Sequence, residues 1–304
     1  MTEKVAESPA LVLRAARLLG AAIACATLVF GVFVGRSAAQ VPGPNINMVS
    51  GTTLPDGDPF LQRQNEPSIA VSTRNPCHLL AGANDYRTVD IPGLPEDKEN
   101  GGDAWLGLFK SFDCGKTWKS NLIPGYPQDT TPEGKSSPLF GLAAGADPIV
   151  RAGTNGLFYY SGIVFDRGAN APSKVFVARF IDNNVEVNAQ GQPVDPIAYL
   201  GTSVVDAGTS GQFNDKPFIA VDIPRNGKTC SIDGQTIPAG TVYVVFSTFV
   251  GKLTNNTTKL MVAQSTDCGV TWTKPVKISE GVHTNQGAML AVAPNGNVYV
   301  AWRQ

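Results

Sequence analysis

The chain has 304 residues, of which 42% are hydrophobic and only 16% charged, with 32 glycines and 22 prolines. So little charge excludes a long coiled coil and a highly charged disordered chain. The 24 Lys and Arg residues balance 25 Asp and Glu residues without a basic cluster, so no nucleic-acid partner is expected, because duplex binding needs clustered cations that neutralise phosphates.

Residues 1–39 have the pattern of a secretory signal peptide. Three basic residues occur in 1–17, residues 18–34 carry no charge, and the small residues 37–39 follow. This order predicts cleavage after Ala39 and a secreted, periplasmic or cell-surface protein. The alternative is an uncleaved anchor, because the apolar run is near the lower limit of about 17 residues for a spanning helix. Membrane contact is expected only through this segment.

The rest of the chain consists of a linker or closing strand, residues 40–59, and a repeat. One phrase occurs four times, as NEPSIAVS, ADPIVRAG, DKPFIAVD and QGAMLAVA, beginning at residues 65, 146, 215 and 286. Pro67, Pro148, Pro217 and Ala288 mark the same register, at separations of 81, 69 and 71 residues. Such regular self-similarity predicts a repeat architecture.

Each phrase is followed by further short runs of β-branched and aromatic residues bounded by Gly, Pro and Asn. The second runs span 78–85, 156–165, 240–249 and 296–302, and third runs span 104–111, 173–180 and 259–265. Runs of this kind predict strands. Helical periodicity is absent after the leader, so the predicted fold class is all-β.

Two of the third runs end in a common motif, Ser-x-Asp-x-Gly-x-Thr-Trp. The first copy comprises Ser111, Asp113, Gly115, Thr117 and Trp118, and the second comprises Ser265, Asp267, Gly269, Thr271 and Trp272. The Asp carboxylates are expected to accept amide hydrogens of a turn, the glycines to adopt a left-handed conformation, and the Trp rings to pack against the sheet.

This motif is the Asp-box, and residues 60–304 resemble the sialidase-like Asp-box, or BNR repeat, β-propellers. The resemblance implies four-stranded antiparallel blades at about 60–140, 141–210, 211–282 and, in part, 283–304. It also implies that the boxes join the third and fourth strands, on the side away from the active site, and act as scaffold. The second blade has ARFIDNN where a box is expected, so its turn must be held differently.

Three and a half blades do not close a ring, since propellers typically have four to eight. We therefore expect an incomplete six- or seven-blade ring belonging to a longer protein. The alternative is a small closed ring in which residues 44–54 complete the last blade.

Four cysteines remain after the leader, and the repeat suggests how they pair. Cys77 and Cys230 are placed in the turns after first strands, whereas Cys114 and Cys268 lie inside boxes. In a four-stranded meander these turns share one face, which predicts bonds Cys77–Cys114 and Cys230–Cys268, in keeping with an exported protein. The alternative is four buried thiols.

No cofactor and no metal site is expected. The chain has no Cys-x-x-Cys, only two histidines and no Gly-rich phosphate loop. Asp56 and Asp58 could help bind calcium, but a turn is the preferred interpretation.

The mouth of such a propeller is expected at the starts of the first strands and in the second-to-third-strand loops. The candidate ligand-binding residues there are Glu66, Asp85, Arg87, Asp147, Asp166, Arg167 and Asp215, accompanied by Asn65, Tyr86, Asn214 and Lys216. Their carboxylates, amides and cations suit a polar ligand such as a sugar. The alternative is that several of them cap strands or pair with one another.

The predicted function is a carbohydrate- or cell-surface-binding module. One alternative is an exo-acting, sialidase-type glycoside hydrolase whose remaining catalytic residues lie beyond Gln304, and another is a structural or protein-partner-binding propeller. The resemblance implies three arginines and a Tyr–Glu pair in an active sialidase, but Asn65 stands where the first arginine is expected. No residue is therefore assigned as catalytic.

Overall fold

The computed structural model describes residues 43–49, 64–88, 103–168, 171–209, 211–232, 234–252, 255–281 and 284–304. The predicted signal peptide, the Asp56 and Asp58 turn, and His283 lie outside these residues. No helix in the described part is long and apolar enough to cross a membrane. The chain divides into two compact units, residues 1–45 and 46–304, and the strands of the described residues all lie in the second.

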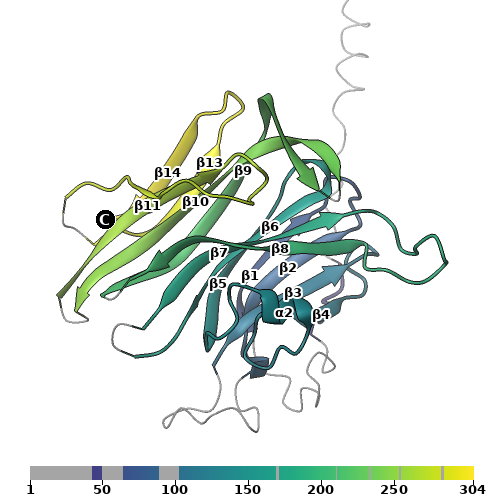
Figure 1. Cartoon of the computed structure of the whole chain (residues 1–304), viewed down its shortest axis with the longest axis horizontal. Helices are drawn as coiled ribbons and strands as arrows, with labels where there is room; N and C mark the ends of the chain where they lie inside the picture. The colour runs from purple at the N-terminus through teal and green to yellow at the C-terminus, as the bar shows by residue number, and fades with distance from the viewer. Residues whose placement is uncertain are drawn as a thin grey trace, which may run out of the picture. The chain divides into compact units, whose positions relative to one another are not determined.

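The second unit is built from three four-stranded antiparallel sheets and one two-stranded sheet (Figure 1). The first sheet comprises β1 (Gln64–Val71), β2 (Leu79–Asp85), β3 (Trp105–Ser111) and β4 (Lys119–Leu122). The second comprises β5 (Ala144–Ala152), β6 (Leu157–Phe165), β7 (Ser173–Asp182) and β8 (Ile197–Gly208). The third comprises β9 (Gln212–Ile232), β10 (Gln235–Lys252), β11 (Asn255–Ser265) and β12 (Val276–Lys277), and β13 (Gln286–Val292) pairs with β14 (Val298–Arg303).

The strands within each sheet pair in sequence order, and the first strands β1, β5, β9 and β13 are neighbours in that order. This is the arrangement of propeller blades, in which each sheet packs on the next and the first strand is innermost. The predicted fold class is confirmed, and the sheets form an open array in the described residues. Three short helices interrupt it: α2 (Pro132–Ser136) and the 3₁₀ turns η1 (Tyr86–Thr88) and η2 (Thr154–Gly156).

Apolar side chains fill the space between successive sheets. Every residue of β6 is buried, and alternate side chains enter two different cores. Tyr160 packs toward the first sheet, whereas Tyr159 packs toward the third, because successive strand residues point to opposite faces. The Tyr160 ring occupies the space that a Cβ at position 82 would need, which explains Gly82. Burial on both faces is the physical reason for the unbroken apolar run of β6.

The two outermost sheets expose apolar side chains on their outer faces. Met289 and Tyr299 of the β13–β14 sheet are each 61% exposed, and Ile69 of β1 is 55% exposed. Met48 and Val49, from the segment predicted as a linker or closing strand, pack beside Phe109 on the first sheet without forming a strand.

Two disulfides join Cys77 to Cys114 and Cys230 to Cys268, the pairs that the repeat suggests. The placement of Cys230 in a turn was wrong, because β9 continues to Ile232 and pairs Cys230 with Ile237 of β10. Register shifts near Gly240 let the hairpin bend and carry the ladder past Pro224 and Pro238. The strands β9 and β10 of the third sheet are therefore longer than the repeat predicts.

These bonds and the strand register define two ends of the sheets. We call the end with the β1–β2 and β3–β4 turns and their counterparts the box end. The opposite end, where β1, β5 and β9 begin, is the axial end. Glu66 and Asp85 lie at the axial end, because Gln64 pairs with Asp85 and Asp85 with Trp105.

Candidate functional site

All four first strands share a bulge near their starts, at the axial end. The pairing register shifts there in each sheet. The bulge residue has a positive φ in every case: 52° at Glu66, 61° at Asp147, 48° at Lys216 and 64° at Gly287. Non-glycine residues in this region are strained and collect at functional sites. The first three also precede proline, so the repeated phrase places three charged side chains in equivalent, unusual conformations.

The side chains of these three residues meet across three blades. The Nζ atom of Lys216 lies 2.5 Å from Oε2 of Glu66 and 3.2 Å from Oδ1 of Asp147. The backbone N–H of Lys216 also donates to Oδ2 of Asp147 at 3.1 Å. The Asp215 carboxyl, one residue before Lys216, interacts with the Asp147 carboxyl. We call Glu66, Asp147, Asp215 and Lys216 the axial cluster.

A chain of amide side chains supports the cluster on the side of the first blade. The Asn84 side chain donates to Oδ1 of Asn65 at 2.8 Å, and its Oδ1 accepts the N–H of Asp147 at 2.8 Å. Asn84 is buried at the end of β2 and was not among the predicted site residues. Its position at a strand end beside Asp85 is the sequence feature that would have indicated it.

The cluster separates the pKa values of its carboxyl groups. The hydrogen bond from Lys216 lowers the pKa of Glu66. Burial raises the pKa of Asp147, although Lys216 opposes this effect. Burial, together with the adjacent Asp147 carboxyl, raises the pKa of Asp215 to about 7. Burial lowers the pKa of Lys216, but its two carboxylate partners outweigh that effect and raise it overall.

Two other predicted binding residues, Asp85 and Arg87, pair with each other inside the first blade. Both side chains are fully buried, and the guanidinium contacts the carboxylate at 2.6 Å. Arg87 also donates to Oγ of Ser120 at 2.6 Å and to the carbonyl oxygen of Asn121 at 2.9 Å. This geometry gives the pair a structural role at the axial end, bracing η1 against β4.

Asp166 and Arg167 lie in the β6–β7 loop and are not part of the axial cluster. Asp166 accepts the N–H of Ala143 at 2.8 Å, and the exposed Arg167 forms a salt bridge with Asp103 at 2.7 Å. Of the seven predicted binding residues, the structure therefore brings three together: Glu66, Asp147 and Asp215.

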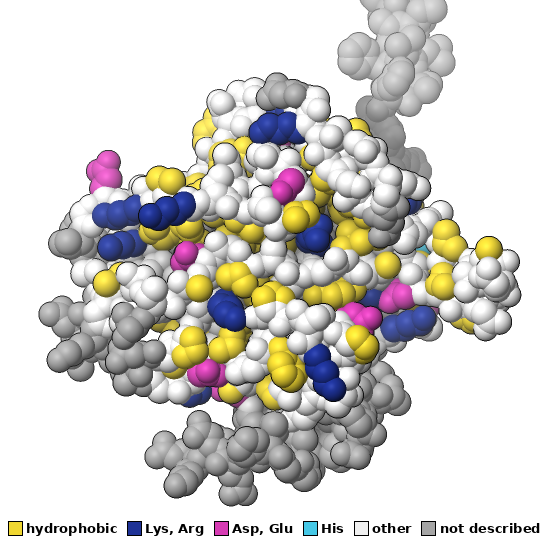
Figure 2. Space-filling view, in the orientation of Figure 1, with side chains coloured by type: hydrophobic (Ala, Val, Ile, Leu, Met, Phe, Trp, Pro, Cys, Tyr) yellow, Lys and Arg dark blue, Asp and Glu magenta, His cyan; other side chains and the backbone are white. Residues whose placement is uncertain are grey.

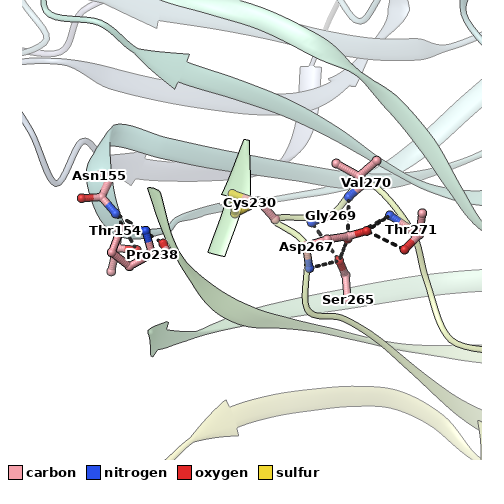
Figure 3. The surroundings of a disulfide bond; sticks show 10 residues. Thr154, Asn155, Cys230, Pro238, Ser265, Asp267, Gly269, Val270 and Thr271 are labelled. Atoms are coloured by element: carbon pink, nitrogen blue, oxygen red, sulfur yellow. Dashed lines mark hydrogen bonds between the residues drawn. A yellow bond between two sulfur atoms is a disulfide. The ribbon is translucent and has the colours of Figure 1, made fainter. Parts of the chain in front are cut away.

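The two Ser-x-Asp turns have nearly the same hydrogen bonds, at the box end. Asp113 accepts from Ser111 and, with both oxygens, from Thr117, at 2.7–3.0 Å. Asp267 accepts from Ser265 and Thr271 in the same way (Figure 3). Gly115 and Gly269 have the left-handed conformation expected of them.

Each of these turns also fixes its surroundings. Cys114 and Cys268 precede the glycines with φ of 63° and 58°, so each disulfide starts from the turn itself. Trp272 donates through Nε1 to Oγ of Ser203 in the second blade at 2.9 Å. The motif thus ties the third sheet to its neighbour as well as closing its own turn.

The second blade holds its corresponding turn through a buried carboxylate that the first blade helps to satisfy. Asp182 accepts from Oγ of Ser72 at 2.5 Å and from the N–H of Asn184 at 2.8 Å. Nδ1 of His78 lies 3.0 Å from the same carboxylate. Ser72 and His78 belong to the first blade, so a serine from another sheet takes the place of the missing motif serine.

The described residues contain no group of three or more His, Cys, Asp or Glu side chains arranged to hold a metal ion. Figure 2 shows hydrophobic, acidic and basic side chains intermixed on one face.

No family model and no curated protein matches the chain. Among solved structures, it is similar to the α-L-arabinofuranosidase Arb93A from Fusarium graminearum, with 18% identity over 79% of this chain and 56% of that chain and a TM-score of 0.44. It is also similar to Trypanosoma rangeli sialidase, with 12% identity over 83% of this chain and 37% of that chain and a TM-score of 0.46. A GH62 hydrolase in complex with xylotriose shares 11% identity over 79% of this chain and 65% of that chain, with a TM-score of 0.37. The chain thus spans about half of the arabinofuranosidase and little more than a third of the sialidase.

Proposed function

We propose that the protein is an exported Asp-box propeller that binds a carbohydrate at the axial cluster. The observation that carries the proposal is the convergence of Glu66, Asp147 and Lys216 from three blades at one repeated bulge position. Ligand sites place a few polar groups precisely on a rigid scaffold, and strain persists where function requires it. The mixed carboxylates and ammonium group suit hydroxyl groups, which both donate and accept hydrogen bonds.

Binding of immobilised glycans to the purified chain tests this proposal. The Glu66→Gln/Lys216→Met double variant is expected to lose at least tenfold in affinity for any glycan that the wild type retains. Glu186→Gln is the control, because Glu186 is exposed in the β7–β8 loop at the box end. The axial site would be rejected if the control lost as much glycan affinity as the double variant, or if the double variant lost none. If no glycan binds, a structural or protein-binding propeller is favoured instead.

A second candidate function, glycoside hydrolysis, is favoured by the divided pKa values. Glu66 has a lowered pKa and Asp215 one raised to about 7, as expected where one cluster supplies both an ionised carboxylate and a proton donor. Release of reducing sugar from a bound glycan tests it. Asp215→Asn would then abolish turnover while retaining binding, whereas wild-type binding without turnover would reject hydrolysis.

A further inference from the structure

The axial cluster holds more potential negative than positive charge. Glu66, Asp147 and Asp215 contribute three carboxyl groups, and Lys216 contributes the one ammonium group. Two other predicted cations of the axial end are engaged elsewhere: Arg87 contacts Asp85 in the first blade, and Arg167 contacts Asp103.

Lys216 is itself committed to two of the carboxylates. Its Nζ atom is within salt-bridge distance of both Glu66 and Asp147, and the Asp147 side chain is only 12% exposed. The charge of Lys216 is thus already offset by two carboxylates, and an anionic ligand group that drew Lys216 away from them would leave Asp147 buried without its counter-ion. Removing one partner of a buried charge pair is costly because the other charge is left uncompensated.

We infer that the axial cluster selects uncharged glycans and discriminates against glycans that carry a carboxylate, with Asp147 and Asp215 as the specificity-determining residues. This inference rests on the proposed function. An uncharged hydroxyl donates to Glu66 or Asp147 without displacing Lys216, whereas a ligand carboxylate meets two like-charged neighbours.

Asp215 strengthens the discrimination differently at different pH. Burial and the adjacent Asp147 carboxyl raise its pKa to about 7, so below that value it is protonated and adds no negative charge to the cluster. Above that value it adds a third negative charge. Discrimination against anionic glycans is therefore expected to increase as the pH rises from 6 to 8.

The test compares a neutral oligosaccharide with the matching oligosaccharide that ends in a uronic acid, measured by calorimetry at pH 6 and pH 8. The wild type is expected to bind the neutral glycan at least tenfold more tightly at pH 8. Asp215→Asn should reduce that ratio severalfold and make it independent of pH. Glu186→Gln should leave the ratio unchanged.

Equal or tighter binding of the acidic glycan by the wild type would overturn the inference while leaving the proposed function intact. If Asp215→Asn and Asp147→Asn both kept the wild-type ratio of neutral to acidic glycan affinity, the two aspartates would not be the specificity-determining residues. Failure of both glycans and of every other immobilised glycan would instead reject the proposed function. Circular dichroism of each variant separates these outcomes from misfolding.

Discussion

The two ends of the sheets are built in opposite ways. At the box end, Asp113 and Asp267 bind partners two to four residues away, and each disulfide closes a loop of fewer than forty residues. At the axial end, Lys216 reaches Asp147 across 69 residues and Glu66 across 150. Local contacts close the Ser-x-Asp turns, although Ser72–Asp182 and Ser203–Trp272 join neighbouring blades at the same end, whereas the candidate site is assembled by long-range contacts alone.

The ends also differ in what their polar groups contribute to stability. The box end satisfies its carboxylates with several donors each. The axial end places carboxyl groups beside one another, and its left-handed residues Glu66, Asp147 and Lys216 are charged, whereas those of the box-end turns, Cys114 and Cys268, carry the disulfides. Such arrangements cost stability and are retained where binding needs them. Substitutions of the hydrogen-bonded carboxylates and disulfides at the box end should therefore destabilise the protein, and some substitutions at the axial end should stabilise it.

The largest effect is expected from removing a box-end disulfide. The Cys230→Ala/Cys268→Ala variant frees a loop closed over 38 residues, and its free energy of unfolding should fall by about 4 kcal/mol because the unfolded chain gains entropy. Urea unfolding under non-reducing conditions measures the change. Glycan affinity of the folded variant should stay within twofold of wild type. A loss below about 1 kcal/mol would contradict a scaffold role for this bond.

A smaller loss of stability is expected from Asp182→Asn, because Asp182 links the first and second blades. The amide has one acceptor oxygen where the carboxylate has two, and its NH₂ group faces donors, so a buried donor from Ser72 or His78 loses its partner. The free energy of unfolding should fall by about 2 kcal/mol. Thermal unfolding compares this variant with Glu186→Gln, which lies at the same end and should change stability by less than about 0.5 kcal/mol. Equal effects would show that the buried carboxylate is not the element that joins the blades.

The smallest effect, of opposite sign, is expected from Asp215→Asn at the axial end. The folded state raises the pKa of Asp215 from its ordinary 3.8 to about 7. The contribution of protonated Asp215 to the free energy of unfolding is therefore fully present below pH 3.8 and is lost as the pH rises through 7. Asn cannot ionise, so the variant should be more stable than the wild type at pH 8 and equally stable at pH 3. The difference at pH 8 should be roughly 1 kcal/mol, because solvent partly screens the charge of a half-buried carboxylate. Chemical unfolding at both values measures this. The same difference at pH 3 and pH 8 would exclude ionisation as its cause.

The sequence predicted much of the scaffold, for physical reasons that individual elements illustrate. Repeated apolar runs located the first, second and third strands, because inner strands such as β6 are buried on both faces and the repeat carries the same runs into the outermost strands. It did not predict the extension of β9 to Ile232, since Pro224, Pro238 and nearby glycines are typical of turns and only the paired strand accommodates them. It also missed α2, a single turn capped by Thr131.

By itself, the sequence determined the Ser-x-Asp turns, because their contacts lie within four residues, where spacing alone fixes geometry. It also determined the all-β repeat, because the apolar runs recur in the same order along the chain. The sequence also predicted that the candidate charged residues lie at one end of the strands. Only the tertiary structure decided among them: it buried Asp85 against Arg87, directed Arg167 to Asp103, and brought Glu66, Asp147 and Lys216 together. That choice depends on how each blade is rotated against the next, and the packing of whole sheets sets this rotation.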